Sequence, residues 1–258
     1  MTVRDTPWAP GTPCWVDLMT TDQAAAQKFY GELFGWDLAV GGEDTGGYAM
    51  ASIGGRAVAG IGGMMGLEHP PVWNTYLATA DADATSDAVQ KAGGTVMAPP
   101  MDVMDLGRMA FAQVPGGGVF SYWQAGTHHG AGIANEPNTL TWNEFLTRDL
   151  PTATLFYASV FDYTYTNVGN DEMAYSTIEV DGQTVGGIGA LPAALPAEVP
   201  PHWRVYFAVE DADATVAKVS ALGGTVLRPA MDMPFGRHAD LADPQGAMFS
   251  VIKPTPQA

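Results

Sequence analysis

Apolar and polar positions along the chain alternate between strand-like and helix-like stretches in a fixed order. Residues 13–20 form a mostly apolar run that is followed by Asp22, a residue type that commonly caps helices. Apolar side chains then recur at helical spacing as far as Phe34. Three short strands separated by glycine-rich turns are predicted after that helix, near residues 36–40, 48–53 and 56–62. The first segment therefore follows the order βαβββ.

A second segment with the same order begins at Trp73. Its helix is predicted over about residues 84–92, starting after Asp83 and ending at Gly93-Gly94. Its later strands are expected near residues 94–98, 108–113 and 118–124. The first half of the chain thus contains two βαβββ units.

The second half of the chain repeats the first. Trp15 to Asp22 matches Trp142 to Asp149 at a spacing of 127 residues, and later segments match as well. Gly, Pro and Asn are frequent between the halves, as is typical of a linker. We therefore expect an α+β fold with four βαβββ units in two modules, which are residues 1–126 and 139–258 joined by a linker over 127–138.

Glycines recur at one place in a predicted strand of each half. Gly60-Ile61-Gly62 in the first half matches Gly187-Ile188-Gly189 in the second. Neither run lies between a strand and a helix with a basic phosphate ligand, which argues against a nucleotide-binding loop. We expect a bulge or a sharp bend in a curved sheet at both places.

Composition narrows the classes of partner. The 258 residues include 28 acidic and 11 basic side chains, for a formal net charge of −17, and each half carries its share. Such a chain is repelled by nucleic-acid phosphates and anionic lipid, so we expect neither nucleic acid nor membrane as a partner. The sequence contains no signal-like or membrane-spanning apolar run, which predicts a cytoplasmic protein. Cys14 is the one cysteine and cannot form an internal disulfide.

A strand, an aspartate and a small-residue helix that carries Phe29-Tyr30 and ends near Phe34-Gly35-Trp36 resemble the vicinal oxygen chelate superfamily of glyoxalases, bleomycin-resistance proteins and extradiol dioxygenases. The segment from Ala242 to Ser250 resembles it too. The likeness covers nearly the whole chain and is greatest to two-module actinobacterial proteins, some labelled hydroxylase. It implies curved, open mixed sheets, each with a concave face that binds a small molecule.

Metal-dependent members of that superfamily bind a divalent metal through His and Glu at three positions of the concave face. The corresponding positions hold Trp15, Asn74 and Ser121 in the first module and Trp142, Arg204 and Ser250 in the second. Indole and guanidinium offer no lone pair to a metal. We therefore expect no metal and no other cofactor, and we place His128 and His129 in a solvated linker.

Side chains alternate between the two faces of a strand, so placing residues 15 and 142 in the cavities also places their neighbours. The first cavity is expected to hold Trp15, Asp17, Met19, Asn74, Tyr76, Val119, Ser121 and Trp123. The second is expected to hold Trp142, Glu144, Leu146, Arg204, Tyr206, Met248 and Ser250. Both sets combine aromatic walls with a few polar groups, as small-molecule pockets do.

Candidate catalytic roles follow from these sets. Asp17 or Glu144 would be a general base, Arg204 or Tyr206 would stabilise developing negative charge, and His238 would be an acid/base group. Structural alternatives stay open: the carboxylates would only accept hydrogen bonds or pair with arginine, and His238 would be a partly exposed strand residue.

The same alternative applies to the two tryptophans, Trp15 and Trp142. They would either stack on an aromatic or hydrophobic ligand or simply fill the volume left by the missing metal.

Three functions are compatible with this pattern. The first is a metal-independent enzyme, of lyase, isomerase or hydroxylase-like type, that acts by acid/base chemistry on an aromatic or carbonyl-bearing metabolite. The second is a protein that sequesters such a compound, as bleomycin-resistance proteins do, without catalysis. The third is an enzyme with a rearranged metal site. Because the duplication can replace dimerisation, either a monomer or a homodimer is expected.

Overall fold

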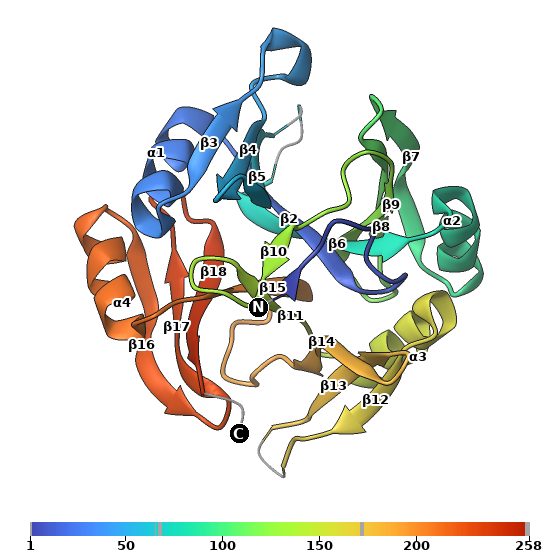
Figure 1. Ribbon diagram of the computed structural model, residues 1–258. Helices are drawn as coiled ribbons and strands as arrows, with labels where there is room; N and C mark the ends of the chain where they lie inside the picture. Colours follow the sequence, from blue (N-terminus) through green and yellow to red (C-terminus); the bar gives the residue numbers. More distant parts are fainter. Residues whose placement is uncertain (1, 65, 67–68, 171–172, 256–258) are drawn as a thin grey trace.

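The computed structural model describes residues 2–64, 66, 69–170 and 173–255, and these residues form two eight-stranded sheets, one two-stranded sheet and four α-helices (Figure 1). Each eight-stranded sheet contains two βαβββ units, and both of these sheets are open and mix parallel with antiparallel pairs. The predicted tandem α+β fold is confirmed. None of the described helices is long and apolar enough to span a membrane.

The first sheet has the strand order β3-β4-β5-β2-β6-β9-β8-β7. Its elements are β2 (Pro13–Thr20), α1 (Gln23–Phe34), β3 (Asp37–Val40), a 3-10 turn (Glu43–Thr45), β4 (Ala49–Ile53), β5 (Arg56–Gly63), β6 (Val72–Thr79), α2 (Ala82–Lys91), β7 (Thr95–Val103), β8 (Gly107–Gln113) and β9 (Val119–Ala125).

The second sheet has the equivalent order β12-β13-β14-β11-β15-β18-β17-β16. Its elements are β11 (Leu140–Thr147), α3 (Leu150–Phe161), β12 (Thr164–Asn167), β13 (Tyr175–Val180), β14 (Gln183–Ala190), β15 (His202–Ala208), α4 (Ala212–Ala221), β16 (Thr225–Met233), β17 (Gly236–Ala242) and β18 (Met248–Pro254).

Each helix begins directly after an aspartate that caps it, and one of these caps differs from the sequence-based prediction. The Asp22 side chain accepts a hydrogen bond from the Ala25 backbone and caps α1 as expected. In the second unit Asp81, and not Asp83, is the cap, because its carboxylate accepts from the backbone N–H groups of residues 83 and 84. The helix predicted over 84–92 therefore begins at residue 82. The strand predicted at 94–98 is also longer, extending to Val103.

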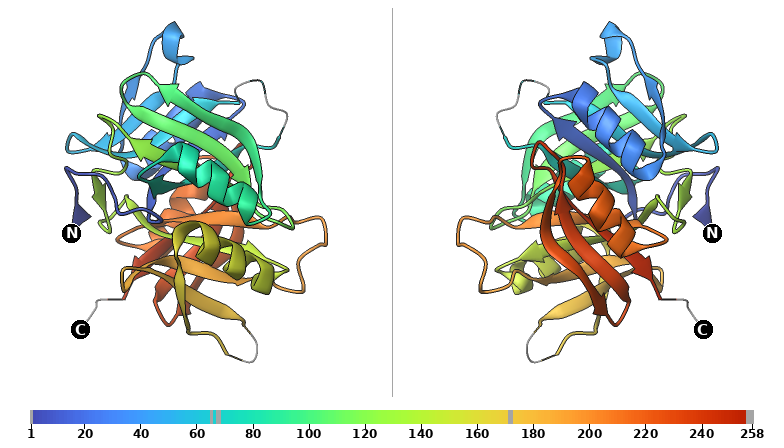
Figure 2. Two further views of the ribbon diagram at one scale, coloured as in Figure 1. Left: turned by 90° about the vertical axis from the view of Figure 1, so that its right-hand side faces the viewer. Right: turned by 90° about the vertical axis from the view of Figure 1, so that its left-hand side faces the viewer.

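Helices of different modules pack against each other. Figure 2 shows α1 beside α4 in one view and α2 beside α3 in the other. One core cluster joins residues of α1 to β15 and β18, and a second joins β6, β8 and β9 to α3. Across the first contact, the Tyr30 hydroxyl donates to Asp243 (3.2 Å) and Lys218 Nζ donates to the Leu33 carbonyl (3.1 Å). The modules therefore share their cores.

Residues 126–132, which we call the strap, connect the end of β9 to a short strand, β10 (Ile133–Ala134), that pairs with β1 (Thr2–Val3). The strap is fixed by backbone hydrogen bonds: His128 donates to Leu106, Ala131 to Cys14 and Gly132 to Ala57. The Trp8 indole adds a bond to the Ala131 carbonyl (3.1 Å). The segment expected to be a solvated linker thus lies against the first module.

Candidate functional site

Each concave face is built around one carboxylate that accepts hydrogen bonds from two tyrosines. In the first module Asp17 accepts from the hydroxyls of Tyr76 (3.0 Å) and Tyr48 (3.4 Å). Asn74 Nδ2 donates to its other oxygen (3.1 Å), and the Trp15 indole donates to Tyr48 (3.2 Å). All five side chains therefore form one network, four of whose members alternation predicted.

The second module repeats this arrangement with Glu144 at its centre. The hydroxyls of Tyr206 (2.8 Å) and Tyr175 (2.9 Å) donate to different oxygens of its carboxylate. The Trp142 indole donates to Tyr175 (3.0 Å). Burial and the nearby Glu144 raise the pKa of both tyrosines, so they stay protonated and act as donors.

The recurring glycines explain how the second tyrosine reaches the carboxylate. A Cβ built on Gly60 would overlap the Tyr48 hydroxyl, and one built on Gly187 would overlap the Tyr175 hydroxyl. Neither residue lies at a register shift between its strand and β4 or β13. The register does shift next to both glycine runs, between Ala57 and Ala59 and between Thr184 and Gly186, so the expected bulge lies directly beside these positions. At Gly60 and Gly187 themselves, glycine is needed because a tyrosine crosses the strand in close contact with its backbone.

The second face differs from the first by a cluster of charges. Arg204 Nη1 lies 3.8 Å from Glu144 Oε1 and 3.6 Å from Asp240 Oδ2. Arg228 reaches the same Asp240 oxygen at 2.8 Å, and Ser250 Oγ donates to the other (2.7 Å). Burial opposes the charge on Arg204, but the attraction of Asp240 and its neighbours outweighs it and raises the pKa of the guanidinium. Two cations and two carboxylates thus share one partly buried surface.

His238 and Met248 complete the predicted set on the second face. His238 is 6% exposed, which corrects the expectation of a partly exposed histidine. Its ring centroid lies 6.4 Å from that of Tyr206. Burial, together with Arg228 and Arg204, lowers its pKa, while Asp240 opposes this shift, so the ring is neutral at pH 7. Met248 is 53% exposed and lies at the rim of the face.

The first face is covered by the strap. The His128 ring packs edge-on against Trp15, with centroids 4.6 Å apart, and against Trp123 at 5.7 Å. The Trp123 indole donates to the His128 carbonyl (2.9 Å). His128 Nε2 is buried without a hydrogen-bond partner in the described structure, and burial lowers the pKa of the ring to about 4. The prediction of a solvated histidine is wrong here because the ring lies between two tryptophans.

The burial of the first face changes the pKa of its carboxylate. Burial raises the pKa of Asp17 to about 6, although the three hydrogen bonds that it accepts oppose the shift. No Lys or Arg ion pair reaches Asp17 within the described ranges. Trp15 is only 4% exposed, whereas Trp142 is partly exposed. The first face is therefore closed and weakly charged, and the second is more open and strongly polar.

The described part of the first face lacks a hydrogen-bond acceptor equivalent to Asp240 for its buried serine, Ser121. Ser121 is buried, and its Oγ has no hydrogen bond of ordinary geometry within the described residues. It lies opposite Phe111 in the ladder, at the place where Ser250 lies opposite Asp240. The serine is common to both modules, but its acceptor is present only in the second.

Several residues of the two faces were missed by the sequence analysis. They are Tyr48, Tyr175, Arg228, Asp240 and His128. The two tyrosines were visible as a matched pair in the repeat. Asp240 lies two residues from His238 in the same strand, so alternation from His238 would have placed it on the same face.

The positions that hold the metal in the resembling superfamily do not fit one here. Trp15 and Trp142 each use their indole N–H as a donor, and Arg204 is a cation, so these three side chains offer a metal no lone pair. Among the described residues no group of three or more His, Cys, Asp or Glu side chains is arranged to hold a metal ion. We therefore derive no chemical step through a metal.

Comparison with known proteins settles the family. The sequence matches the Glyoxalase/Bleomycin resistance protein/Dioxygenase superfamily over residues 14–122 and again over residues 124–251. The chain belongs to this superfamily.

Relatives in this superfamily align over almost the full chain. The chain is 48% identical to the protein named "Putative glyoxylase CFP32" of Mycobacterium bovis, over 96% of both sequences. It is 38% identical to the anthracycline biosynthesis protein DauV of Streptomyces sp. strain C5, over 96% of this chain and 95% of that protein.

Solved structures share the fold at low sequence identity. The Mn(II)-bound glyoxalase from Novosphingobium aromaticivorans superimposes with a TM-score of 0.67 at 15% identity, covering 95% of this chain and 82% of that one. The 2,2',3-trihydroxybiphenyl 1,2-dioxygenase from Sphingomonas wittichii gives a TM-score of 0.66 at 12% identity, with 95% and 91% covered. At these identities the likeness concerns the fold alone.

Proposed function

We propose that this superfamily member binds a carbonyl-bearing aromatic molecule on the concave face of the second module and acts on it by acid/base chemistry, without a metal. The observation that carries the proposal is the position of Glu144. Its carboxylate is held by two tyrosine hydroxyls and faces Arg204 at 3.8 Å. A fixed base beside a fixed cation is the arrangement that proton abstraction next to a carbonyl requires.

In this proposal Glu144 removes a proton from the carbon next to the substrate carbonyl. The electron pair of the broken C–H bond moves to the carbonyl oxygen, and Arg204 stabilises the resulting enolate. The Tyr206 hydroxyl, which donates to Glu144 in the resting structure, turns to the enolate oxygen once Glu144 has taken the proton. Glu144 then returns the proton to a conjugated carbon, so the net reaction is an isomerisation. Return of the proton to the original carbon regenerates the substrate and is seen only as exchange of that proton with solvent. In this proposal His238, whose pKa is lowered by burial, donates a hydrogen bond to the same oxygen.

The aromatic part of the substrate is inferred from the walls of the face. Trp142 and the ring of Tyr206 supply flat apolar surface, and Met231 (40% exposed) and Met248 (53% exposed) supply adaptable apolar surface at the rim. Asn74, Ser121 and the other predicted ligand-binding residues of the first module have no part in this site. The 38% identity to proteins named for anthracycline biosynthesis supports a fused-ring ligand.

Sequestration without catalysis is the second candidate, and one observation favours it. Both oxygens of Glu144 already accept hydrogen bonds, and Asp240 competes for the charge of Arg204, which weakens the base and the oxyanion site together. A face of this kind would still bind an aromatic ligand by stacking and hydrogen bonding.

Deuterium exchange separates the two candidates. A panel of fused-ring aromatic ketones is incubated with the protein in D₂O, binding is followed by tryptophan fluorescence quenching, and deuterium uptake is followed by mass spectrometry. We expect Glu144→Gln to lower the exchange rate about 100-fold or more while binding changes little. The matched variant Asp17→Asn, which alters the equivalent residue of the first module, should retain exchange within about twofold. Tight binding with no exchange above the solvent rate would reject catalysis in favour of sequestration.

A further inference from the structure

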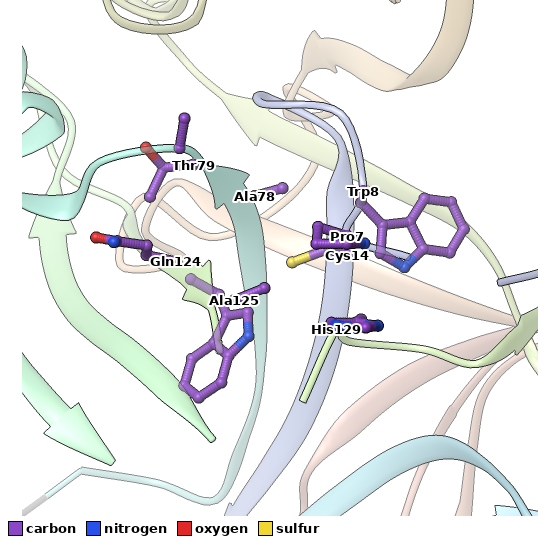
Figure 3. A pocket seen from close by; sticks show the side chains of 10 residues that line it. Pro7, Trp8, Cys14, Ala78, Thr79, Gln124, Ala125 and His129 are labelled. Carbon is purple, nitrogen blue, oxygen red and sulfur yellow. The ribbon is translucent and has the colours of Figure 1, made fainter. Parts of the chain in front are cut away.

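A separate cavity lies at one end of the first sheet, where β6 and β9 end and β2 begins. Its volume is about 220 Å³. Figure 3 shows the side chains around it: Cys14 comes from β2, Ala78 from β6, Gln124 from β9 and His129 from the strap. Trp8 from the N-terminal segment forms a further part of the wall, and none of the lining residues belongs to the network around Glu144. The cavity is therefore independent of the proposed active site.

Two indoles give this cavity fixed apolar walls. The N–H of Trp8 donates to the Ala131 carbonyl (3.1 Å), and that of Trp123 donates to the His128 carbonyl (2.9 Å). Because both donors are used inside the protein, the rings contribute apolar surface to the cavity. The Cys14 thiol donates to the Tyr76 carbonyl (3.4 Å), and burial raises its pKa, so it adds no charge. Rings held in this way can contact a ligand without first being ordered.

Two polar side-chain groups in the wall are free among the described residues: the His129 imidazole and the Nε2 amide of Gln124, whose Oε1 already accepts from the Ala82 backbone (2.9 Å). The His129 imidazole lines the cavity and makes no hydrogen bond to any residue that the structure describes. By contrast, Thr79 Oγ1 is bonded to Thr85 (2.6 Å) and to the Asp81 carbonyl (3.1 Å). An imidazole can donate to or accept from a hydroxyl group, so it selects a ligand with one such group.

Charge and size limit the ligand further. No Asp, Glu, Lys or Arg lines the cavity, so its wall holds no permanently charged side chain to pair with a charged ligand. An apolar cavity of about 150 Å³ holds benzene in another protein. By that comparison the 220 Å³ here accommodates one substituted ring. We propose that this cavity is a second binding site, for a neutral single-ring aromatic alcohol of the phenol type.

The test uses 4-fluorophenol as the probe and ¹⁹F NMR of the full chain as the readout. We expect saturable binding with a dissociation constant of about 1 mM. Nuclear Overhauser contacts should join the ring protons of the probe to the methyl groups of Ala78 and Ala125. Ala78→Leu adds three carbon atoms to a 5% exposed position in the wall and should weaken binding about tenfold or more. His129→Phe keeps the ring but removes the polar atoms, and should weaken binding while a probe without the hydroxyl, fluorobenzene, is unaffected.

Controls make this test independent of the proposed function. Glu144→Gln should leave binding of 4-fluorophenol unchanged within about twofold, whatever it does to ketone exchange. Ala125→Leu, at a more exposed position of the same wall, replaces Ala78→Leu if that variant fails to fold. The proposal is overturned by an absence of saturable binding, by binding that both leucine variants leave intact, or by binding that Glu144→Gln abolishes.

Discussion

The two concave faces share one scaffold and differ in polarity at four pairs of positions on it. Each has a tryptophan, a carboxylate and two tyrosines in the same hydrogen-bonded order, and a glycine that lets one tyrosine cross the strand. The second face carries polar or charged side chains where the first has smaller or less polar ones. These pairs are Asn74 and Arg204, Ala98 and Arg228, Met109 and His238, and Phe111 and Asp240.

In the first module the shared network holds a buried carboxylate with no charged partner among the described residues, whereas in the second the equivalent carboxylate faces added polar residues, and that combination distinguishes the two modules. The network around Asp17 persists although the strap covers it, so its hydrogen bonds are sufficient to hold a buried carboxylate. The cluster around Arg204 adds charges that the fold does not need, at a face that the strap leaves uncovered. We therefore place the chemistry on the second face.

The largest expected effect on the free energy of unfolding concerns the buried Asp17. Its pKa is about 6 in the folded protein and about 3.9 in an unfolded chain. The stability that its protonated form contributes is fully present below pH 3.9 and is lost as the pH rises through 6. Asp17→Asn cannot ionise, so its free energy of unfolding relative to the wild type should increase by about 3 kcal/mol between pH 3 and pH 7. Urea unfolding of both proteins across this range measures the change, and a constant difference would contradict the closed first face.

For His128 we expect a smaller change in the free energy of unfolding, with the opposite dependence on pH. Its pKa is about 4 in the folded protein against about 6.5 unfolded. The stability contributed by its neutral ring is fully present above pH 6.5 and is lost as the pH falls towards 4. Relative to the wild type, His128→Leu should therefore gain about 2 kcal/mol on acidification from pH 7 to pH 4, less than the full pKa change because the ring is partly exposed. An unfolding difference independent of pH would show that the strap does not cover the first face in solution.

The two equivalent serines offer a matched comparison with a smaller effect. Ser250→Ala removes a donor from the partly buried Asp240 and should lower the free energy of unfolding by about 1 kcal/mol. Ser121→Ala removes a hydroxyl with no hydrogen bond of ordinary geometry and should change stability by less than about 0.5 kcal/mol. Equal losses in chemical denaturation would mean that the faces are more alike than the structure indicates.

How far the sequence predicts this structure differs between the fold and the site. The repeat and the alternation of faces placed Trp15, Asp17, Tyr76 and their counterparts correctly, because a regular strand fixes which side chains share a face. Arg228 was out of reach, since β16 and β17 change register on both sides of it and alternation fails across such shifts. The packing of the strap against the first module was also not predicted, because composition identifies a linker but not the surface against which it packs.

The central claim, that one face of the two binds the fused-ring ligand, is tested most directly by stoichiometry. Titration calorimetry with a fused-ring aromatic ketone that quenches tryptophan fluorescence should give one site per chain. Replacing Arg204 by Met should weaken that site about tenfold or more, and replacing Asn74, its counterpart, by Leu should leave it unchanged within about twofold. Two equivalent sites per chain would contradict this claim. So would a single site whose affinity falls when Asn74 is replaced and not when Arg204 is replaced.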